Sequence, residues 1–189
     1  GKNQRMTFTL PDQSRVTLNS KSELAYPREF RGDIRNVKLR GEGFFQVQDN
    51  KDKAFVVKTA DFQVEVTGTA FSISNYPGKQ HAETVLLEGG VKVSSQDGNQ
   101  MLRLKPNGML SYSKRQKAFA RKTIDAARRT AWRKGVLIFD NAPIGQVANQ
   151  LENWYGVRID VGDRLREKNR YTMKIRDERL EEVIHLLQL

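Results

Sequence analysis

Residues 62–74 read FQVEVTGTAFSIS, with apolar and polar side chains alternating on both sides of a glycine. Successive side chains of a β-strand point to opposite faces, so the alternation gives each half of the stretch one apolar face. Gly68 interrupts the pattern and is suited to a turn. The stretch therefore predicts two short strands joined through Gly68.

The same period of two extends outward from this stretch, from about Thr7 to Arg121. It recurs in RVTL, NVKLR, VKV and LRL, and no amphipathic helical pattern interrupts it. Short alternating strands separated by turns predict a sandwich, a barrel or a solenoid, so we expect residues 1–125 to form an all-β unit. Turn signals separate the segments at Pro11-Asp12, Gly32-Asp33, Asp49-Asn50, Pro77-Gly78, Gly89-Gly90, Asp97-Gly98 and Asn107-Gly108.

The period changes in residues 126–189. GVLIFDNAP predicts a strand that runs into a turn, with Pro143 suited to the first turn of a helix. An apolar stripe at helical spacing follows, and Gly156 is the residue expected just past the end of that helix. VRIDV, residues 157–161, then alternates as a strand. The stripe consists of Ile144, Val147, Ala148, Leu151, Trp154 and Tyr155.

The strand–turn–helix plan repeats 36 positions later, in YTMKIRDERLEEVIHLLQL, with Asp177 as the expected helix cap. We therefore expect residues 126–189 to form a small α+β unit of βαββα plan. The same offset would place its last strand at 192–197, beyond Leu189, and would leave one sheet edge without a partner. The matched apolar pairs are Phe139 and Ile175, Ile144 and Leu180, Val147 and Val183, Ala148 and Ile184, and Leu151 and Leu187.

Trp154 and Tyr155 stand at the end of the predicted helix. The first interpretation is that both pack the last helical turn onto the small sheet. The second is that part of the Trp154 ring is exposed and anchors a partner, because tryptophan is enriched among binding hot spots.

The chain is strongly basic, with a net charge of +11. Between Lys114 and Lys134 nine basic residues are accompanied by one acidic residue, Asp125. Such a cluster can bind phosphates, form a solvated face or linker, or attract an acidic protein partner. The three interpretations make different predictions about the partner.

The sequence carries no catalytic or metal-binding pattern. There is no cysteine, which excludes a disulfide scaffold, a thiolate metal site and a cysteine nucleophile. The two histidines, His81 and His185, lie in different units and have no metal-ligand spacing to other residues. No phosphate-binding glycine loop and no serine nucleophile motif is present. We therefore expect neither an enzyme nor a cofactor.

Several segments, in order, resemble the FecR-like anti-sigma regulators. The opening FTLPDQSRVTLNSKSELAYPREFRGDIRNVKLRGEGFFQVQ is similar to the start of that family's main domain, with Gln13 in place of a usual turn glycine and Gly43 in place of a usual alanine. Later matches are Gly68-Thr69 with Phe71, Glu88-Gly89, and RLKPNGML. The opening match rests on Leu10, Pro11, Asp12, Ser14, Asn19, Tyr26, Pro27, Phe30, Gly41, Glu42, Phe44 and Phe45.

WRKGVLIFDNAPIGQVANQLENWYGVRIDV resembles the small domain that follows in one branch of the family. That domain is similar in plan to the short N-terminal signalling domain of TonB-dependent receptors and secretins. The resemblance implies the periplasmic portion of a single-pass inner-membrane protein. Its cytoplasmic segment, absent here, would hold an extracytoplasmic-function sigma factor.

The resemblance also implies partners. The periplasmic region would sense the N-terminal signalling domain of an outer-membrane TonB-dependent receptor, and site-specific proteolysis would then release the sigma factor. Glycan uptake is the expected pathway. The expected contact residues are Trp154, Tyr155 and Arg158, and sheet-edge pairing is an available docking mode.

Two other functions remain open from the residues. A carbohydrate-binding β module would sense a glycan directly and would need exposed aromatic platforms. A nucleic-acid-binding module would use the basic stretch and would bind less tightly as salt rises. We expect no nucleic-acid partner, because the aromatic residues occupy strand positions that alternation predicts to be buried.

Overall fold

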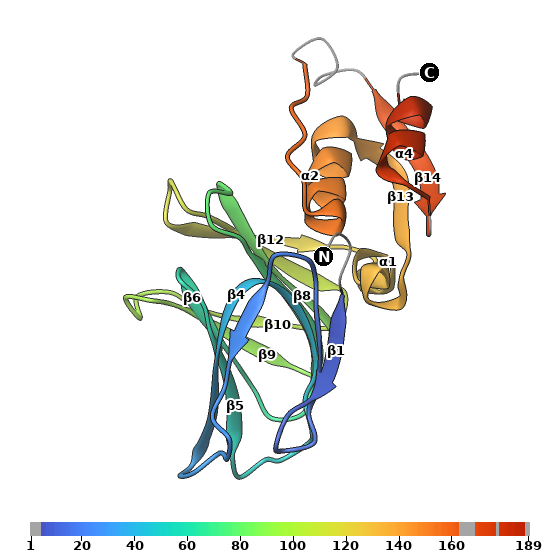
Figure 1. The fold of residues 1–189 in the computed structure, drawn as a ribbon. Helices are drawn as coiled ribbons and strands as arrows, with labels where there is room; N and C mark the ends of the chain where they lie inside the picture. Colours follow the sequence, from blue (N-terminus) through green and yellow to red (C-terminus); the bar gives the residue numbers. More distant parts are fainter. Residues whose placement is uncertain (1–4, 163–168, 177, 188–189) are drawn as a thin grey trace.

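The computed structural model describes residues 5–162, 169–176 and 178–187. Twelve strands come first and form one curled sheet, which we call the β unit; short helices and a two-stranded sheet follow and form the βα unit (Figure 1). The strands of the β unit are β1 (Met6–Thr9), β2 (Arg15–Leu18), β3 (Glu23–Ala25), β4 (Ile34–Gln46), β5 (Ala54–Lys58), β6 (Phe62–Val66), β7 (Ala70–Asn75), β8 (His81–Glu88), β9 (Val91–Ser95), β10 (Met101–Leu104), β11 (Gly108–Ser113) and β12 (Ala118–Thr123).

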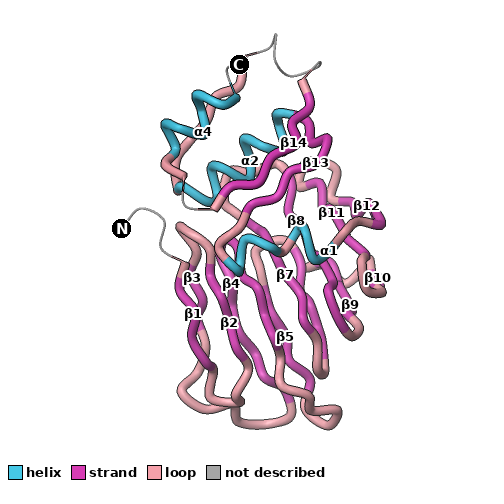
Figure 2. Tube along the Cα trace, turned by 90° about the vertical axis from the view of Figure 1, so that its right-hand side faces the viewer, coloured by secondary structure: helices cyan, strands magenta, loops and turns pink. Residues whose placement is uncertain are grey.

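The βα unit lies at one end of the β unit in both views (Figures 1 and 2). Its elements are α1 (Ala126–Arg129), the 3₁₀ helix η1 (Ala131–Lys134), β13 (Leu137–Pro143), α2 (Ile144–Tyr155), β14 (Arg170–Ile175) and α4 (Leu180–Leu187). The prediction of a mostly β fold with a small α+β unit is confirmed. Within the described residues no helix is long and apolar enough to cross a membrane.

The long strand β4 joins the two halves of the curled sheet. Residues 34–38 pair with β5 in parallel, and residues 41–46 pair with β7 in antiparallel register. The change of partner coincides with Gly41, whose φ is +100°. A Cβ there would lie 2.5 Å from the Ser22 Oγ, so the close approach and the backbone conformation both require glycine.

Two adjacent phenylalanines on β4 serve two different cores. Phe45 belongs to the core inside the curled sheet, where it stacks on Phe71 with ring centroids 5.2 Å apart. Phe44 points the opposite way and belongs to the core of the βα unit, together with Trp132 and Leu151. Because neighbouring residues of a strand point to opposite faces, Phe44 and Phe45 contribute to two different cores although they are adjacent in the sequence.

The 36-residue repeat predicts the helices of the βα unit correctly. α2 begins at Ile144 and α4 at Leu180, which are the two positions that the repeat aligns. Both helices follow a strand, and these strands, β13 and β14, pair with each other in antiparallel register. Gly156 ends α2 with φ +64°, as expected. Pro143 is the last residue of β13 and the residue before α2, and Asp177 lies outside the described residues.

The predicted strand at residues 157–161 is wrong. This segment is described, but it joins no ladder. The backbone N–H of Ile159 donates to the Glu152 Oε1 at 2.8 Å. This N–H is therefore bonded to a side chain and is not available to a neighbouring strand. The apolar residues of this segment still pack: Val157, Ile159 and Val161 are partly buried against the second core.

Candidate functional site

The β unit and the βα unit are packed together by side chains far apart in the sequence. The guanidinium of Arg133 lies over the Phe44 ring, and Arg5 lies over the Trp154 ring, with 4.2 Å from the guanidinium carbon to the ring centroid. Arg5 also donates to the Trp132 carbonyl at 3.3 Å. Cation–π contacts strengthen when water is excluded, so the half-buried Arg133 forms the better shielded contact of the two, whereas Arg5 is exposed.

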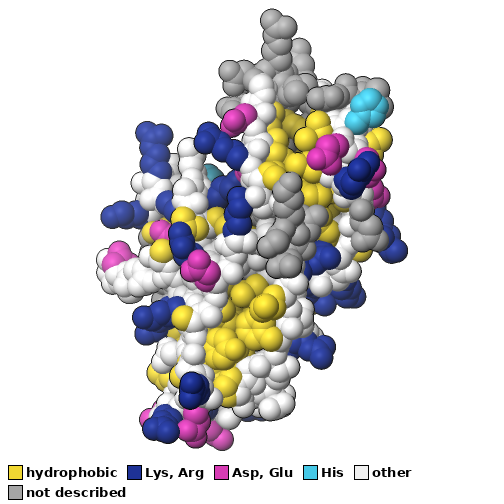
Figure 3. Space-filling model, in the orientation of Figure 1, with side chains coloured by type: hydrophobic (Ala, Val, Ile, Leu, Met, Phe, Trp, Pro, Cys, Tyr) yellow, Lys and Arg dark blue, Asp and Glu magenta, His cyan; other side chains and the backbone are white. Residues whose placement is uncertain are grey.

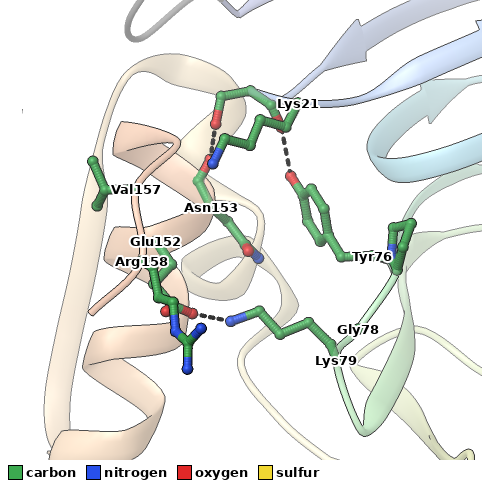
Figure 4. Close-up of a pocket in the computed structure, with 10 residues that line it drawn as sticks. Lys21, Tyr76, Gly78, Lys79, Glu152, Asn153, Val157 and Arg158 are labelled. Atoms are coloured by element: carbon green, nitrogen blue, oxygen red, sulfur yellow. Dashed lines mark hydrogen bonds and ion pairs between the residues drawn. The ribbon is translucent and has the colours of Figure 1, made fainter. Parts of the chain in front are cut away.

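A cleft of about 490 Å³ lies beside this interface (Figure 4). One wall comes from the residues after β2 and after β7, and the other from the end of α2 and the segment that follows it. Its volume is within the range of small-molecule sites. The lining residues are Ser20, Lys21, Tyr76, Pro77, Gly78, Lys79, Glu152, Asn153, Val157 and Arg158.

Polar contacts join the two walls of the cleft. The Ser20 hydroxyl donates to the Asn153 carbonyl, and Lys79 forms an ion pair with Glu152. Lys79 also donates to the Asn149 Oδ1 at 3.0 Å. Burial lowers the pKa of Lys79. These bonds connect α2 to both parts of the opposite wall: Ser20 bonds it to the segment after β2, and Lys79 bonds it to the segment after β7 (Figure 4).

A second cavity of about 320 Å³ shares Lys79, Tyr76 and Asn153 with the cleft and extends toward β8. Arg129, from α1, reaches into it and forms an ion pair with Glu83. Burial acts to lower the pKa of Arg129, but the nearby carboxylates of Glu83 and Glu42 raise it overall. Arg129 is thus held charged at the contact between the two units.

Glu42 is the buried acidic group of this region. It accepts a hydrogen bond from the Asn19 Nδ2 at 2.8 Å and another from the Asn153 Nδ2 at 3.5 Å. Burial raises the pKa of Glu42, outweighing the charge of Arg129 and the bonds from Asn19 and Asn153, which lower it. Asn19 and Glu42 were noted in the sequence as parts of a family pattern, and their role here is to connect β2, β4 and α2.

The three residues expected to contact a partner lie in different environments. Trp154 is 6% exposed beneath Arg5, and Tyr155 is 5% exposed, with its hydroxyl donating to the Glu178 carbonyl at 2.7 Å. Burial raises the pKa of Tyr155 to about 12. The Arg158 side chain is 85% exposed beside Asp160 and lines the cleft. The structure therefore uses both aromatics in packing and presents Arg158 to solvent.

The basic stretch from Lys114 to Lys134 divides into two groups. Lys114 lies 3.2 Å from Asp61, and Arg128 pairs with Asp125 and Asp140. These cations, with Arg129 and Arg133, hold parts of the fold together. The remaining members are exposed: Arg115, Lys117, Arg121, Lys122 and Lys134.

Sequence reasoning did not identify the opposite wall of the cleft. Ser20, Lys21 and Lys79 carry no motif, and Pro77-Gly78 indicates only a turn. In the parts of the chain that the structure describes, no group of three or more His, Cys, Asp or Glu residues could hold a metal ion. The cleft offers cations, one side-chain amide and one paired carboxylate, which are groups that bind and orient.

Comparison with known families accounts for both units. The family described as "FecR protein" matches residues 1–92, and the family described as "FecR, C-terminal" matches residues 136–189. No functionally curated protein matches the chain.

Two crystal structures, both described as a candidate anti-sigma factor from Parabacteroides distasonis, are similar to this chain over its whole length. The first, at 1.65 Å resolution, is 30% identical and has a TM-score of 0.87, and the match covers 88% of that protein. The second, at 2.50 Å, is also 30% identical, with a TM-score of 0.85 and 87% coverage. The family matches and the two similar structures agree on one assignment, a regulatory kind of protein. This chain belongs to the FecR-like family of anti-sigma factors.

Proposed function

We propose that this chain is the periplasmic sensing region of a transmembrane anti-sigma regulator, which reads the state of an outer-membrane TonB-dependent receptor. The receptor's N-terminal signalling domain is the proposed partner. A cytoplasmic segment outside this chain holds the sigma factor, and site-specific proteases release it after the signal arrives. Uptake of a glycan is the proposed pathway.

This proposal rests on the βα unit, which forms one wall of the cleft and, where the structure describes it, has unpaired strand edges. Its sheet has two strands in the described residues, β13 and β14, so each has one edge that pairs with no other strand there. Unpaired edges can accept a strand from another protein. The same unit carries Arg158 on the wall of the cleft, opposite Lys21 of the β unit. A partner bound here would contact both units and could alter how they are held together.

The proposal is tested by calorimetric titration with the signalling domain of the receptor encoded beside this protein. We expect saturable binding at physiological salt and increased hydrogen-exchange protection of residues 170–175. Arg158→Glu should weaken the binding by about tenfold, because it replaces an exposed cation on the cleft wall.

Arg31→Glu is the matched control, since it makes the same charge change at a side chain that is 86% exposed in the β unit. It should leave the affinity unchanged. Absence of binding to the receptor domain, with the fragment folded by circular dichroism, would reject direct receptor sensing.

A further inference from the structure

β10 and β12, the two ends of the main strand order of the curled sheet, are linked by side chains but form no ladder with each other. In the described residues β12 pairs only with β11, and β10 pairs only with β9. Side chains join them instead: Arg121 donates to the Arg103 carbonyl at 2.8 Å, and Gln100 donates to the Lys117 carbonyl at 2.9 Å. We call the region between β10 and β12 the seam.

The inner side of the seam is apolar. Leu102 and Phe119 are partly buried and pack against the core of the β unit. Phe119 contacts two core rings, with centroids 4.7 Å from that of Tyr112 and 5.8 Å from that of Phe62. Because strand residues alternate, Leu102 and Phe119 face inward, while Arg103 and Lys122 face outward.

The outer side of the seam is cationic. Arg103 and Lys122 are exposed, and so are Lys105, Arg115 and Lys117 at the adjoining turns. Figure 3 shows Lys and Arg side chains along the side of the molecule where the β hairpins end. Met101, 61% exposed, is at the start of β10. Much of the +11 net charge therefore surrounds two strands that each have an unpaired edge.

We propose that the seam binds an extended segment of a protein partner in which acidic and apolar residues alternate. Such a segment would add to the edge of β12 as a further strand. Its apolar side chains would face Leu102 and Phe119, and its carboxylates would face Arg103 and Lys122. Its main chain would replace the side-chain bonds made by Arg121 and Gln100.

This occupant fits the seam better than a membrane surface or a nucleic acid. The seam combines an unpaired strand edge with apolar residues on one side and cations on the other, which is the alternation of a single strand. A phosphate surface would use the cations alone and would leave the strand edge and the apolar side unused. The site is also separate from the cleft and from Arg158, so it does not depend on the proposed receptor contact.

The test uses a ten-residue peptide that alternates glutamate with valine, titrated into the whole chain at physiological salt. We expect saturable binding that Arg103→Glu with Lys122→Glu weakens by at least about tenfold. Arg28→Glu with Arg31→Glu is the charge-matched control, made in an exposed loop before β4, and it should bind as the original chain does. Hydrogen exchange should slow in residues 118–123 when the peptide is bound.

Two results would overturn the proposal. One is binding that is not specific to the seam, seen either as equal binding by both double variants or as binding without protection of β12. The other is saturable binding to anionic phosphatidylglycerol vesicles or duplex DNA in the absence of binding to the peptide. Circular dichroism of each double variant establishes that lost binding does not come from unfolding.

Discussion

Arg133 lies over the face of the Phe44 ring, with 4.4 Å between the guanidinium carbon and the ring centroid. Phe44 is on β4 of the β unit, and Arg133 is on η1 of the βα unit, so this pair connects the two. Phe44 is 1% exposed within the second core. The interface between the units is thus part of a hydrophobic core and is not a loose contact.

Phe44→Ala should remove this connection. Truncating a buried phenylalanine costs about 3–5 kcal/mol of unfolding free energy, and here we expect the two units to unfold in separate transitions. Denaturation followed by tryptophan fluorescence, which reports on Trp132 and Trp154, and by far-ultraviolet circular dichroism checks this. Phe62→Ala, confined to the first core, is the control and should not move the tryptophan transition ahead of the other. Coincident transitions in Phe44→Ala would contradict the expectation.

Glu42→Gln should change how stability depends on pH. The pKa of Glu42 is raised above 4.5 in the folded state by burial, so its contribution is fully present below the unfolded-state pKa and is lost as pH rises through the folded pKa. The glutamine variant has no such loss and can still accept from Asn19. In urea unfolding from pH 4 to pH 8, the free energy of unfolding of the variant should rise relative to that of the original chain as pH rises. A difference that does not change with pH would refute this.

Gln13→Gly should stabilise the β unit. Gln13 has φ +68°, in the turn between β1 and β2, where the family pattern has glycine. A non-glycine residue in this conformation destabilises the folded state by about 1–2 kcal/mol. Glycine removes that cost, but its greater freedom in the unfolded chain offsets part of the gain. We expect a net gain of about 0.5–1 kcal/mol in thermal or urea unfolding. Gln13→Ala keeps the Cβ and should show no gain; an equal gain would point to another cause.

Lys79 and Glu152 should show a measurable coupling across the cleft. Their side chains are 33% and 13% exposed, so solvent partly screens the pair, and we expect a coupling of about 1 kcal/mol or less. A double-mutant cycle with Lys79→Met and Glu152→Gln measures it. Glu152→Ala should cost more than Glu152→Gln, because it also removes the acceptor for the Ile159 N–H. Equal costs would show that this bond contributes little.

Local patterns in the sequence correctly predicted most elements. Alternation and turn residues predicted the β unit, and the stripe from Ile144 to Tyr155 predicted α2. They succeeded because side-chain period and backbone conformation are set by neighbours in the chain. The strand at residues 157–161 failed for the complementary reason. Alternation reports one apolar face, but a strand also needs a partner for its main chain, and Glu152 takes the Ile159 N–H.

The sequence by itself determined the fold class, the repeated strand–helix plan and the end of α2 at Gly156. Only the tertiary structure decided what each apolar face meets and which charges are paired. It buried Trp154 under Arg5, assigned Phe44 to the second core, and paired Lys79 with Glu152, 73 positions away. Periodicity fixes which side of an element is apolar, whereas the identity of the surface that covers it depends on packing between segments distant in sequence.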